Sequence, residues 1–182
     1  MADLPTRRAR TLKGHSGPVL RVRYTRDGAY AMTCSADRTL RLWNPARDDE
    51  TGRGTGGLLV KTYSGPHAHE VSDVAISDDK ARFVSCGGDK AAFAWDVATG
   101  QVIRKLEGHT QRLNAVCLCG PGASLALTGS YDASVRVWDL RAQGRAALQL
   151  LDQFRDSVTF DDQLTEQCTD SGLEPDSLAD LS

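Results

Sequence analysis

Three stretches of the chain decide its fold: AMTCSADRTLRLWN (31–44), FVSCGGDKAAFAWD (83–96) and ALTGSYDASVRVWD (126–139). Each carries a hydroxyl residue at its third position, an aspartate at its seventh and a tryptophan six residues after that aspartate. A histidine precedes each stretch at a similar distance. Such self-similarity at a nearly constant period indicates an internal repeat, in which each unit is one supersecondary element.

The repeated polar residues form three sets of four. They are His15, Thr33, Asp37 and Trp43; His67, Ser85, Asp89 and Trp95; His109, Thr128, Asp132 and Trp138. A buried tryptophan needs an acceptor for its indole N–H, and a hydroxyl on the neighbouring strand can accept it. That hydroxyl can donate to the histidine, whose second nitrogen can donate to the aspartate. These sets resemble the structural tetrads of WD repeats, and we expect them to be structural.

Twelve strands fit the repeat, because β-branched and aromatic residues alternate between Gly, Asp and Asn turns. We expect them near 18–24, 29–34, 39–43, 58–63, 71–76, 81–86, 91–95, 101–106, 112–118, 123–129, 134–138 and 147–151. WD repeats of about 40–45 residues build four-stranded propeller blades. The predicted fold class is therefore all-β, an incomplete WD-repeat propeller of about three blades.

The chain divides into three regions. A basic N-terminal arm spans 1–9, three WD repeats span 10–151 (approximately 10–45, 58–97 and 101–140), and an acidic tail spans 152–182. The first and second tryptophans are 52 residues apart and the second and third 43, so a polar, glycine-rich insertion at 46–57 lengthens the first repeat. The tail has nine acidic residues and one basic residue. We expect it to be disordered rather than to form a short amphipathic helix through Leu164, Leu173, Leu178 and Leu181.

The five cysteines, which are Cys34, Cys86, Cys117, Cys119 and Cys168, lack the paired spacing of a zinc site. They are typical of buried free thiols in a reducing compartment. No apolar run approaches the roughly 20 residues of a membrane span, and the first residues lack the apolar core of a secretory signal. We therefore expect a cytoplasmic protein that can also be nuclear.

Residues 10–151 resemble the mitogen-activated protein kinase organizer family, also called WD repeat domain 83 proteins. The stretches that carry the resemblance are LRLWNP (40–45), KTYSG (61–65), GGDKA (87–91), WDVATGQVIRK (95–105) and LD (151–152). The resemblance implies a seven-bladed propeller that acts as a scaffold in mitogen-activated kinase signalling and associates with the spliceosome. This chain departs from the family at Pro66, at the 46–57 insertion and beyond about residue 158, where four further blades would follow.

Three blades leave apolar blade faces and strand edges uncovered, because neighbouring blades normally bury one another. We consider three explanations: a truncated or frame-shifted product without function, a short isoform, and a half-propeller that associates with itself.

Candidate partner-binding residues lie on the loops at one end of the blades, since propellers bind partners through loops on a rigid scaffold. By resemblance to WD proteins, these positions come three and five residues after each histidine and one before each aspartate. Arg112 and Tyr131 are the strongest candidates because Arg and Tyr are favoured binding anchors. Glu70 and Asn114 support them.

The segment Trp138-Asp139-Leu140-Arg141 suggests an alternative binding function. This segment resembles the end of the box through which WD proteins dock on the adaptor of cullin-4 ubiquitin ligases. Arg141 would be the charged anchor of a substrate receptor.

Other classes of function find no support in the sequence. A Ser-His-Asp hydrolase is disfavoured because the same polar residues recur in all three repeats, and because the tryptophan N–H would already be bonded to the hydroxyl. The basic residues Arg7, Arg8, Arg10, Lys13, Arg21, Arg23 and Arg26 lack interleaved aromatics, so we expect most of them to form a solvated arm and strand exterior rather than to bind nucleic acid. We expect no catalytic residue, metal, cofactor, small-molecule substrate or membrane partner, and other proteins as partners.

Overall fold

A computed structural model describes residues 11–48, 56–142 and 148–151. They form three four-stranded antiparallel sheets, here called blades 1, 2 and 3. Blade 1 comprises β1 (Val19–Tyr24), β2 (Ala31–Ser35), β3 (Leu40–Asp48) and β4 (Gly57–Tyr63). Blade 2 comprises β5 (Val71–Ile76), β6 (Arg82–Gly87), β7 (Ala91–Asp96) and β8 (Val102–Glu107). Blade 3 comprises β9 (Leu113–Cys119), β10 (Leu125–Ser130), β11 (Val135–Asp139) and β12 (Gln149–Leu151).

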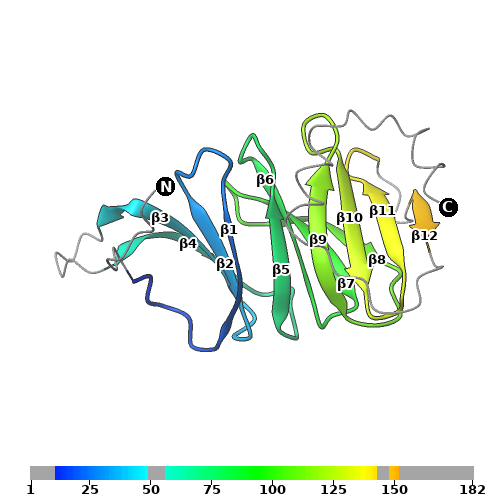
Figure 1. Ribbon diagram of the computed structural model, residues 1–182, viewed down its shortest axis with the longest axis horizontal. Coiled ribbons are helices and arrows are strands. Elements are labelled where there is room, and N and C mark those ends of the chain that lie inside the picture. The colour runs from blue at the N-terminus through cyan, green and yellow to red at the C-terminus, as the bar shows by residue number, and fades with distance from the viewer. Residues whose placement is uncertain (1–10, 49–55, 143–147, 152–182) are drawn as a thin grey trace, which may run out of the picture.

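The blades stand in a row, with blade 1 and blade 3 at opposite ends (Figure 1). Within each blade the strands follow one another in sequence order, and the inner strands β1, β5 and β9 contact one another between blades. The expected fold class is confirmed, since the described chain is an all-β arc of three propeller blades. All twelve predicted strands are present.

One difference from the sequence-based expectation concerns the insertion at 46–57. Strand β3 continues to Asp48, where it pairs with Gly57, so the hairpin begins and ends inside the predicted loop. The ladder is irregular between Asn44 and Asp48, as expected where extra residues are accommodated in a strand. Residues 49–55, the predicted N-terminal arm (1–9) and the predicted acidic tail (152–182) lie outside the described residues.

The core consists of two layers, one between each pair of blades. The first joins the β2 and β3 side chains of blade 1 to Val71, Val74 and Phe83 of blade 2. The second joins β6 and β7 of blade 2 to Leu113 and Val116 of blade 3. Blade 2 therefore contributes one face to blade 1 and the opposite face to blade 3.

A buried carboxylate links the inner strands of all three blades. Asp73 on β5 is fully buried and accepts hydrogen bonds from Arg21 Nε of β1 (3.1 Å), the backbone N–H of Val74 (2.9 Å) and the backbone N–H of Val116 on β9 (3.1 Å). Arg23 Nε lies 3.7 Å from the same carboxylate. Arg21 and Arg23 are therefore exceptions to the expected solvated exterior, because a buried negative charge holds both of them at the blade junction.

Four of the cysteines, Cys34, Cys86, Cys117 and Cys119, are buried and form no disulfide within the described part of the chain, while Cys168 lies outside it. Burial raises the pKa of Cys34 to about 12, and the nearby carboxylate of Asp73 adds to the shift. This thiol therefore stays protonated near neutral pH. None of the described residues forms a helix long and apolar enough to cross a membrane.

Candidate functional site

In each blade, the structure brings the four repeated polar residues into one hydrogen-bonded chain. The indole N–H of Trp43, Trp95 and Trp138 donates to the hydroxyl of Thr33, Ser85 and Thr128 at 2.9, 2.8 and 2.9 Å. The histidine Nε2 atoms lie 2.7–2.8 Å from the same hydroxyls. The histidine Nδ1 atoms lie 2.9, 2.6 and 2.9 Å from Asp37, Asp89 and Asp132. A hydroxyl that donates to Nε2 leaves Nδ1–H to donate to the carboxylate, so every proton in the chain is used.

Each aspartate also ties two loops together. Asp37 accepts the backbone N–H of Ser16 (2.9 Å) from the loop before β1 and that of Thr39 (3.0 Å) from its own turn. Asp132 does the same with Thr110 (2.9 Å) and Ser134 (3.1 Å). These bonds hold the loop before each inner strand against the turn between the second and third strands.

Sequence reasoning missed a second set of donors to these aspartates. The Thr39 hydroxyl donates to Asp37 at 2.6 Å, and the Ser134 hydroxyl donates to Asp132 at 2.5 Å. Both lie two residues after the aspartate, where the matching residue of blade 2 is Ala91. The spacing Asp-x-Ser/Thr in two of three repeats is the signal that could have revealed them.

The environment lowers the pKa of the tetrad residues His67, His109, Asp37 and Asp132, so these histidines stay neutral and these aspartates stay charged. Burial lowers the pKa of His67 and His109, and this effect outweighs the opposing influence of Asp89 and Asp132. Burial alone would raise the pKa of Asp132, but hydrogen bonds from Ser134, Thr110 and His109 hold it well below 3.8. These four side chains therefore act as fixed hydrogen-bonding groups rather than as proton-transfer groups at neutral pH.

We expect stability to fall when the pH drops below neutrality. A histidine with a lower pKa in the folded state takes up a proton on unfolding, so its contribution is lost as the pH falls through the usual value of 6.5. The carboxylates with lowered pKa add a second loss below about pH 4. Thermal unfolding followed by circular dichroism between pH 8 and 4 should show a lower Tm at pH 5.5 than at pH 7.5, by about 2–4 °C for each kcal/mol lost.

His69 provides the control for this prediction, because it is exposed and lies two residues after the buried His67. A His69→Ala variant should keep the same pH profile. A Tm that is equal or higher at pH 5.5 in the unmodified chain contradicts the explanation.

The loops and turns at the tetrad end of the blades form a regular surface, here called the tetrad-end face. The residue before each tetrad aspartate donates its backbone N–H to the residue three after the histidine. The three bonds are Ala36 to Pro18 (3.0 Å), Gly88 to Glu70 (3.1 Å) and Tyr131 to Arg112 (3.0 Å). The residues proposed for partner binding are thus held in bonded pairs on a rigid frame.

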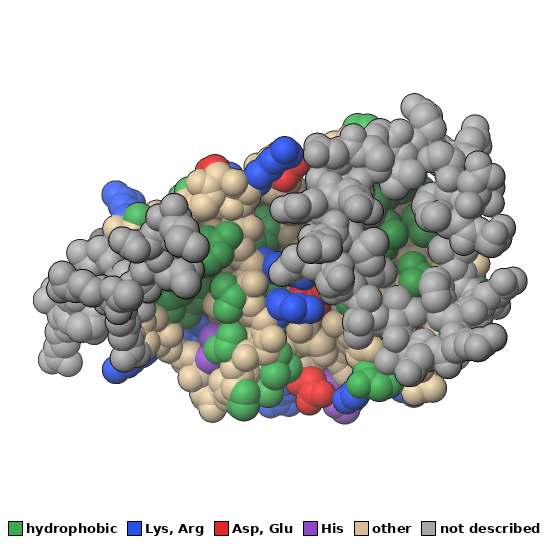
Figure 2. Space-filling view, viewed as in Figure 1, with side chains coloured by type: hydrophobic (Ala, Val, Ile, Leu, Met, Phe, Trp, Pro, Cys, Tyr) green, Lys and Arg blue, Asp and Glu red, His purple; other side chains and the backbone are tan. Residues whose placement is uncertain are grey.

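Three of the predicted binding residues meet on this face at the junction of blades 2 and 3. The Arg112 guanidinium stacks over the Tyr131 ring, with its central carbon 3.9 Å from the ring centroid. An Arg112 nitrogen lies 4.0 Å from a carboxylate oxygen of Glu70, which comes from blade 2. The Arg112 and Glu70 side chains are 50% and 49% exposed and Tyr131 is 41% exposed, so all three remain accessible. Acidic, basic and histidine side chains lie together along the lower edge of the view in Figure 2.

The other two candidates, Asn114 and Arg141, lie outside this cluster. Asn114, on β9, is only partly exposed. Arg141 follows β11 at the opposite end of blade 3 and is 68% exposed. Its guanidinium contacts the Asp139 carboxylate at 3.2 and 3.4 Å, so the charged residue of the Trp-Asp-x-Arg segment pairs with the aspartate of the same segment.

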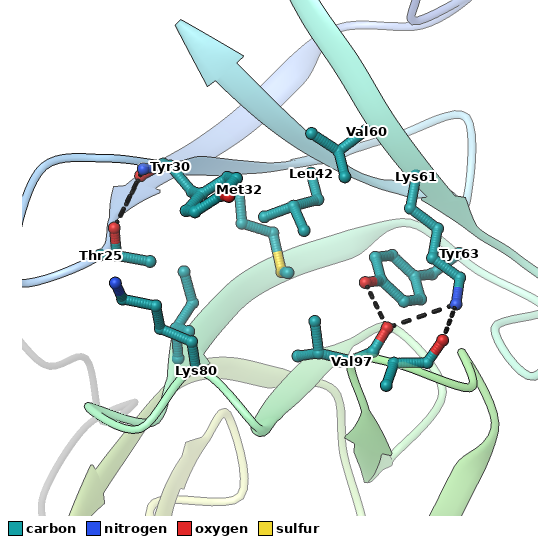
Figure 3. Close-up of a pocket in the computed structure, with 11 residues that line it drawn as sticks. Thr25, Tyr30, Met32, Leu42, Val60, Lys61, Tyr63, Lys80 and Val97 are labelled. Atoms are coloured by element: carbon teal, nitrogen blue, oxygen red, sulfur yellow. Dashed lines mark hydrogen bonds between the residues drawn. The ribbon is translucent and has the colours of Figure 1, made fainter. Parts of the chain in front are cut away.

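A pocket of about 430 Å³ lies between blades 1 and 2, on the side away from the tetrad-end face (Figure 3). Its wall is mainly apolar, with Met32, Leu42 and Val60 from blade 1 and Ile76 and Val97 from blade 2.

The polar groups of the pocket are already bound. The Tyr63 hydroxyl donates to the Val97 carbonyl (3.1 Å), and the Lys61 ammonium donates to the Val97 and Ala98 carbonyls (3.3 and 2.6 Å). Burial, aided by Asp96, raises the pKa of Tyr63 to about 12, so its hydroxyl remains a donor. The Lys80 ammonium pairs with Asp27. The pocket offers an apolar surface but no free acid–base pair among these residues.

Comparisons with known proteins agree with this geometry. The family model described as "WD domain, G-beta repeat" matches residues 6–44, 57–96 and 100–139. A WD repeat domain-containing protein 83 homolog from Dictyostelium discoideum is 30% identical over 151 residues, which cover 82% of this chain and 43% of the relative. WD repeat domain-containing protein 83 from Homo sapiens is 45% identical over 83 residues, which cover 46% of this chain and 23% of the relative. Nuclear distribution protein PAC1 from Arthroderma otae is 33% identical over 141 residues, which cover 72% of this chain and 28% of the relative.

The chain spans less than half the length of these relatives. The matched segments enclose the three tetrads and the loops that carry Glu70, Arg112 and Tyr131. Three complete tetrads, three four-stranded blades and three matches to one family model agree with one another. This chain therefore belongs to the WD40 (G-beta repeat) family and is a WD-repeat protein that resembles WD repeat domain-containing protein 83.

Proposed function

We propose that this chain is a non-enzymatic adaptor that binds a partner protein through Glu70, Arg112 and Tyr131 on the tetrad-end face. The observation that carries the proposal is the exposed stack of Arg112 on Tyr131 in blade 3, with Glu70 of blade 2 beside it. Arginine and tyrosine are enriched among residues that dominate binding energies, because each combines a large contact area with directed polar groups.

The family supports a binding role. WD-repeat proteins generally act in protein–protein interaction, and the WD40 family typically serves as a non-enzymatic scaffold. Among the described residues, no group of three or more His, Cys, Asp or Glu side chains is arranged to hold a metal ion. In every blade, the His and Asp side chains of the tetrad take part in structural hydrogen bonds.

The rigid setting of the cluster favours binding. The Ser130 hydroxyl donates to the Arg112 carbonyl at 2.9 Å, and the Tyr131 N–H donates to the same carbonyl. A Cβ atom added at Gly87 would lie 2.0 Å from the Glu70 carbonyl oxygen, so the backbone at Glu70 is fixed by a close approach that only glycine permits. Little conformational entropy is then lost when a partner binds.

The cellular processes in which the chain would act are also part of the proposal, and they rest on its resemblance to WD repeat domain 83 proteins. We place the chain in assemblies of mitogen-activated kinase signalling or pre-mRNA splicing, and hence in the cytoplasm and nucleus where those assemblies work. Because the chain spans less than half of its relatives, it would carry the part of such a binding surface that these three blades hold.

Alanine at Arg112 or Tyr131 is expected to weaken partner binding by about 30-fold or more, since truncation of a hot-spot residue costs about 2 kcal/mol or more. The tagged chain and each variant should be used to capture partners from cell extract, with quantitative mass spectrometry as the readout. Kinase-cascade and splicing components should be depleted in the variant samples.

Arg26→Ala is the matched control, because Arg26 is also an exposed arginine but lies in the β1–β2 turn at the opposite end of the blades, paired with Asp78. It should leave partner capture unchanged. Equal capture by the Arg112 and Tyr131 variants and the unmodified chain would reject this site.

A further inference from the structure

The pocket between blades 1 and 2 has the size and the lining of a site for a small ligand. Its volume of about 430 Å³ lies within the range of roughly 300–1,000 Å³ that is usual for such sites. Its floor is buried, since Met32, Leu42 and Tyr63 are 0%, 8% and 1% exposed. Val60 also lines the pocket and is 46% exposed, so the apolar floor can be reached from solvent on that side.

The charged side chains that line this pocket are all positive. Lys61 and Lys80 belong to the lining, and none of the described residues that line the pocket is an aspartate or a glutamate. Figure 3 shows Lys61 beside Tyr63 at one end and Lys80 near Thr25 at the other, with Met32 between them. An apolar wall with ammonium groups at its ends is complementary to a ligand that joins an apolar body to a negative charge.

The two lysines differ in how their charges are balanced. The Lys80 ammonium pairs with the Asp27 carboxylate. The Lys61 ammonium instead donates to the carbonyl oxygens of Val97 (3.3 Å) and Ala98 (2.6 Å). These two acceptors are neutral, and an ammonium group has three donors, so Lys61 keeps its charge and a further N–H for an anion. The negative group of a ligand therefore fits best at the Lys61 end.

The Lys61 ammonium is held in place before any ligand binds. Lys61 lies on β4 of blade 1, whereas both of its carbonyl acceptors follow β7 in blade 2. Its nitrogen lies 5.5 Å from the centroid of the Tyr63 ring, and a Cβ atom added at Gly100 would lie 3.0 Å from it. The Asp96 carboxylate accepts the backbone N–H and the hydroxyl of Thr99 (2.6 and 2.8 Å) and does not line the pocket. An anion would thus meet a positioned donor, which lowers the entropy lost on binding.

We propose that this pocket binds a free organic acid with an apolar chain or ring, such as a medium-chain fatty acid. The carboxylate lies on the Lys61 ammonium, and the apolar part lies against Met32 and Leu42. The ligand is bound rather than converted, because the polar groups of Lys61, Tyr63 and Lys80 are engaged in hydrogen bonds or an ion pair. The pocket lies on the side away from the tetrad-end face, so this site is separate from the one proposed for a partner protein.

Methyl NMR of the 182-residue chain, titrated with hexanoate, octanoate and decanoate, tests the proposal. The methyl signals of Met32, Val60 and Val97 should shift and saturate. Affinity should rise about fourfold for each methylene that is added until the pocket is full, as expected when a CH₂ group leaves water. Octan-1-ol and octylammonium, which have the same chain without the negative charge, should bind about tenfold more weakly than octanoate.

Lys61→Met should weaken octanoate binding by about tenfold or more and leave octan-1-ol binding unchanged, because only the acid uses the ammonium group. Lys105→Met is the matched control, since Lys105 is 51% exposed on β8, pairs with Glu107 and does not line the pocket. It should bind octanoate like the unmodified chain. Circular dichroism and a thermal melt show whether each variant is folded.

Val60→Glu tests the same site without removing an interblade hydrogen bond. A carboxylate at this half-exposed position should repel octanoate and abolish the shifts of the Met32 and Val97 methyl signals. Ile103→Glu is the control, because the pairing registers place Ile103 at the matching position of β8, where it is 55% exposed. It should leave octanoate binding unchanged.

Three outcomes overturn the proposal. One is a set of shifts confined to Val19 and Val22, which are exposed on β1, with the pocket signals unmoved. Another is equal affinity for octanoate and octan-1-ol, which would leave Lys61 without a role. The third is an acidic peptide with a central leucine that shifts the pocket signals while octanoate does not, since the pocket would then bind a partner protein rather than a free acid.

Discussion

Asp73→Ala is expected to lower the free energy of unfolding by about 3 kcal/mol. Breaking a buried ion pair by removing one partner costs about 3–5 kcal/mol, and the lower end applies because Arg21 and Arg23 are partly exposed and can reach water. The substitution also leaves the buried N–H groups of Val74 and Val116 without their acceptor. An unpaired buried donor costs about 1–3 kcal/mol by itself.

Chemical denaturation monitored by tryptophan fluorescence measures this effect. Asp78→Ala is the control, since Asp78 is 63% exposed and forms a surface ion pair with the exposed Arg26. Such a surface pair contributes about 0–1 kcal/mol. If the two variants lose the same small amount of stability, Asp73 does not join the blades in the way its contacts indicate.

Trp95→Ala is expected to cost about 3–5 kcal/mol, the range for removing a large aromatic side chain from a packed core. Trp95 is 1% exposed and stacks on Phe83, with 5.4 Å between ring centroids and 14° between ring planes. Its indole N–H is bonded to Ser85, and its ring belongs to the core layer between blades 1 and 2. A marginally stable arc would then be mostly unfolded at room temperature.

A Trp95→Phe variant separates packing from hydrogen bonding. It keeps an aromatic ring but removes the indole N–H, so it should cost less than Trp95→Ala. Ser85→Ala should cost about 1–3 kcal/mol, because the Trp95 N–H and the His67 nitrogen both lose their partner. A double-mutant cycle between Trp95→Phe and Ser85→Ala should show coupling; strict additivity would mean that the tetrad does not act as a unit.

The strands of the fold could be predicted because local sequence patterns specify them. The twelve strands follow from period-two alternation and turn residues, which act over a few positions. Strand β3 ran longer than predicted because Asp48, beyond the irregularity that follows Asn44, still pairs with Gly57 of β4, a cross-strand effect that the composition of the segment conceals.

The candidate site was predictable in its positions but not in its contacts. Counting from His67, His109 and Asp132 identified Glu70, Arg112 and Tyr131, because the backbone bonds between loop and turn recur in every blade. The stack of Arg112 on Tyr131 and the approach of Glu70 depend on side-chain directions and on the junction of two blades. Neither can be read from spacing alone.

The sequence by itself determined the repeat, the tetrads and the strand order, since these arise from a short-range spacing of residues that recurs three times in the chain. Only the tertiary structure decided which residues meet between blades. It made Arg21 and Arg23 partners of the buried Asp73, and it exposed Val19 and Val22 although Val71 and Val74, at the matching positions of blade 2, are buried. The physical reason is that burial belongs to the stacking of one blade on the next, so the same side chain is core or surface according to whether a neighbouring blade is present.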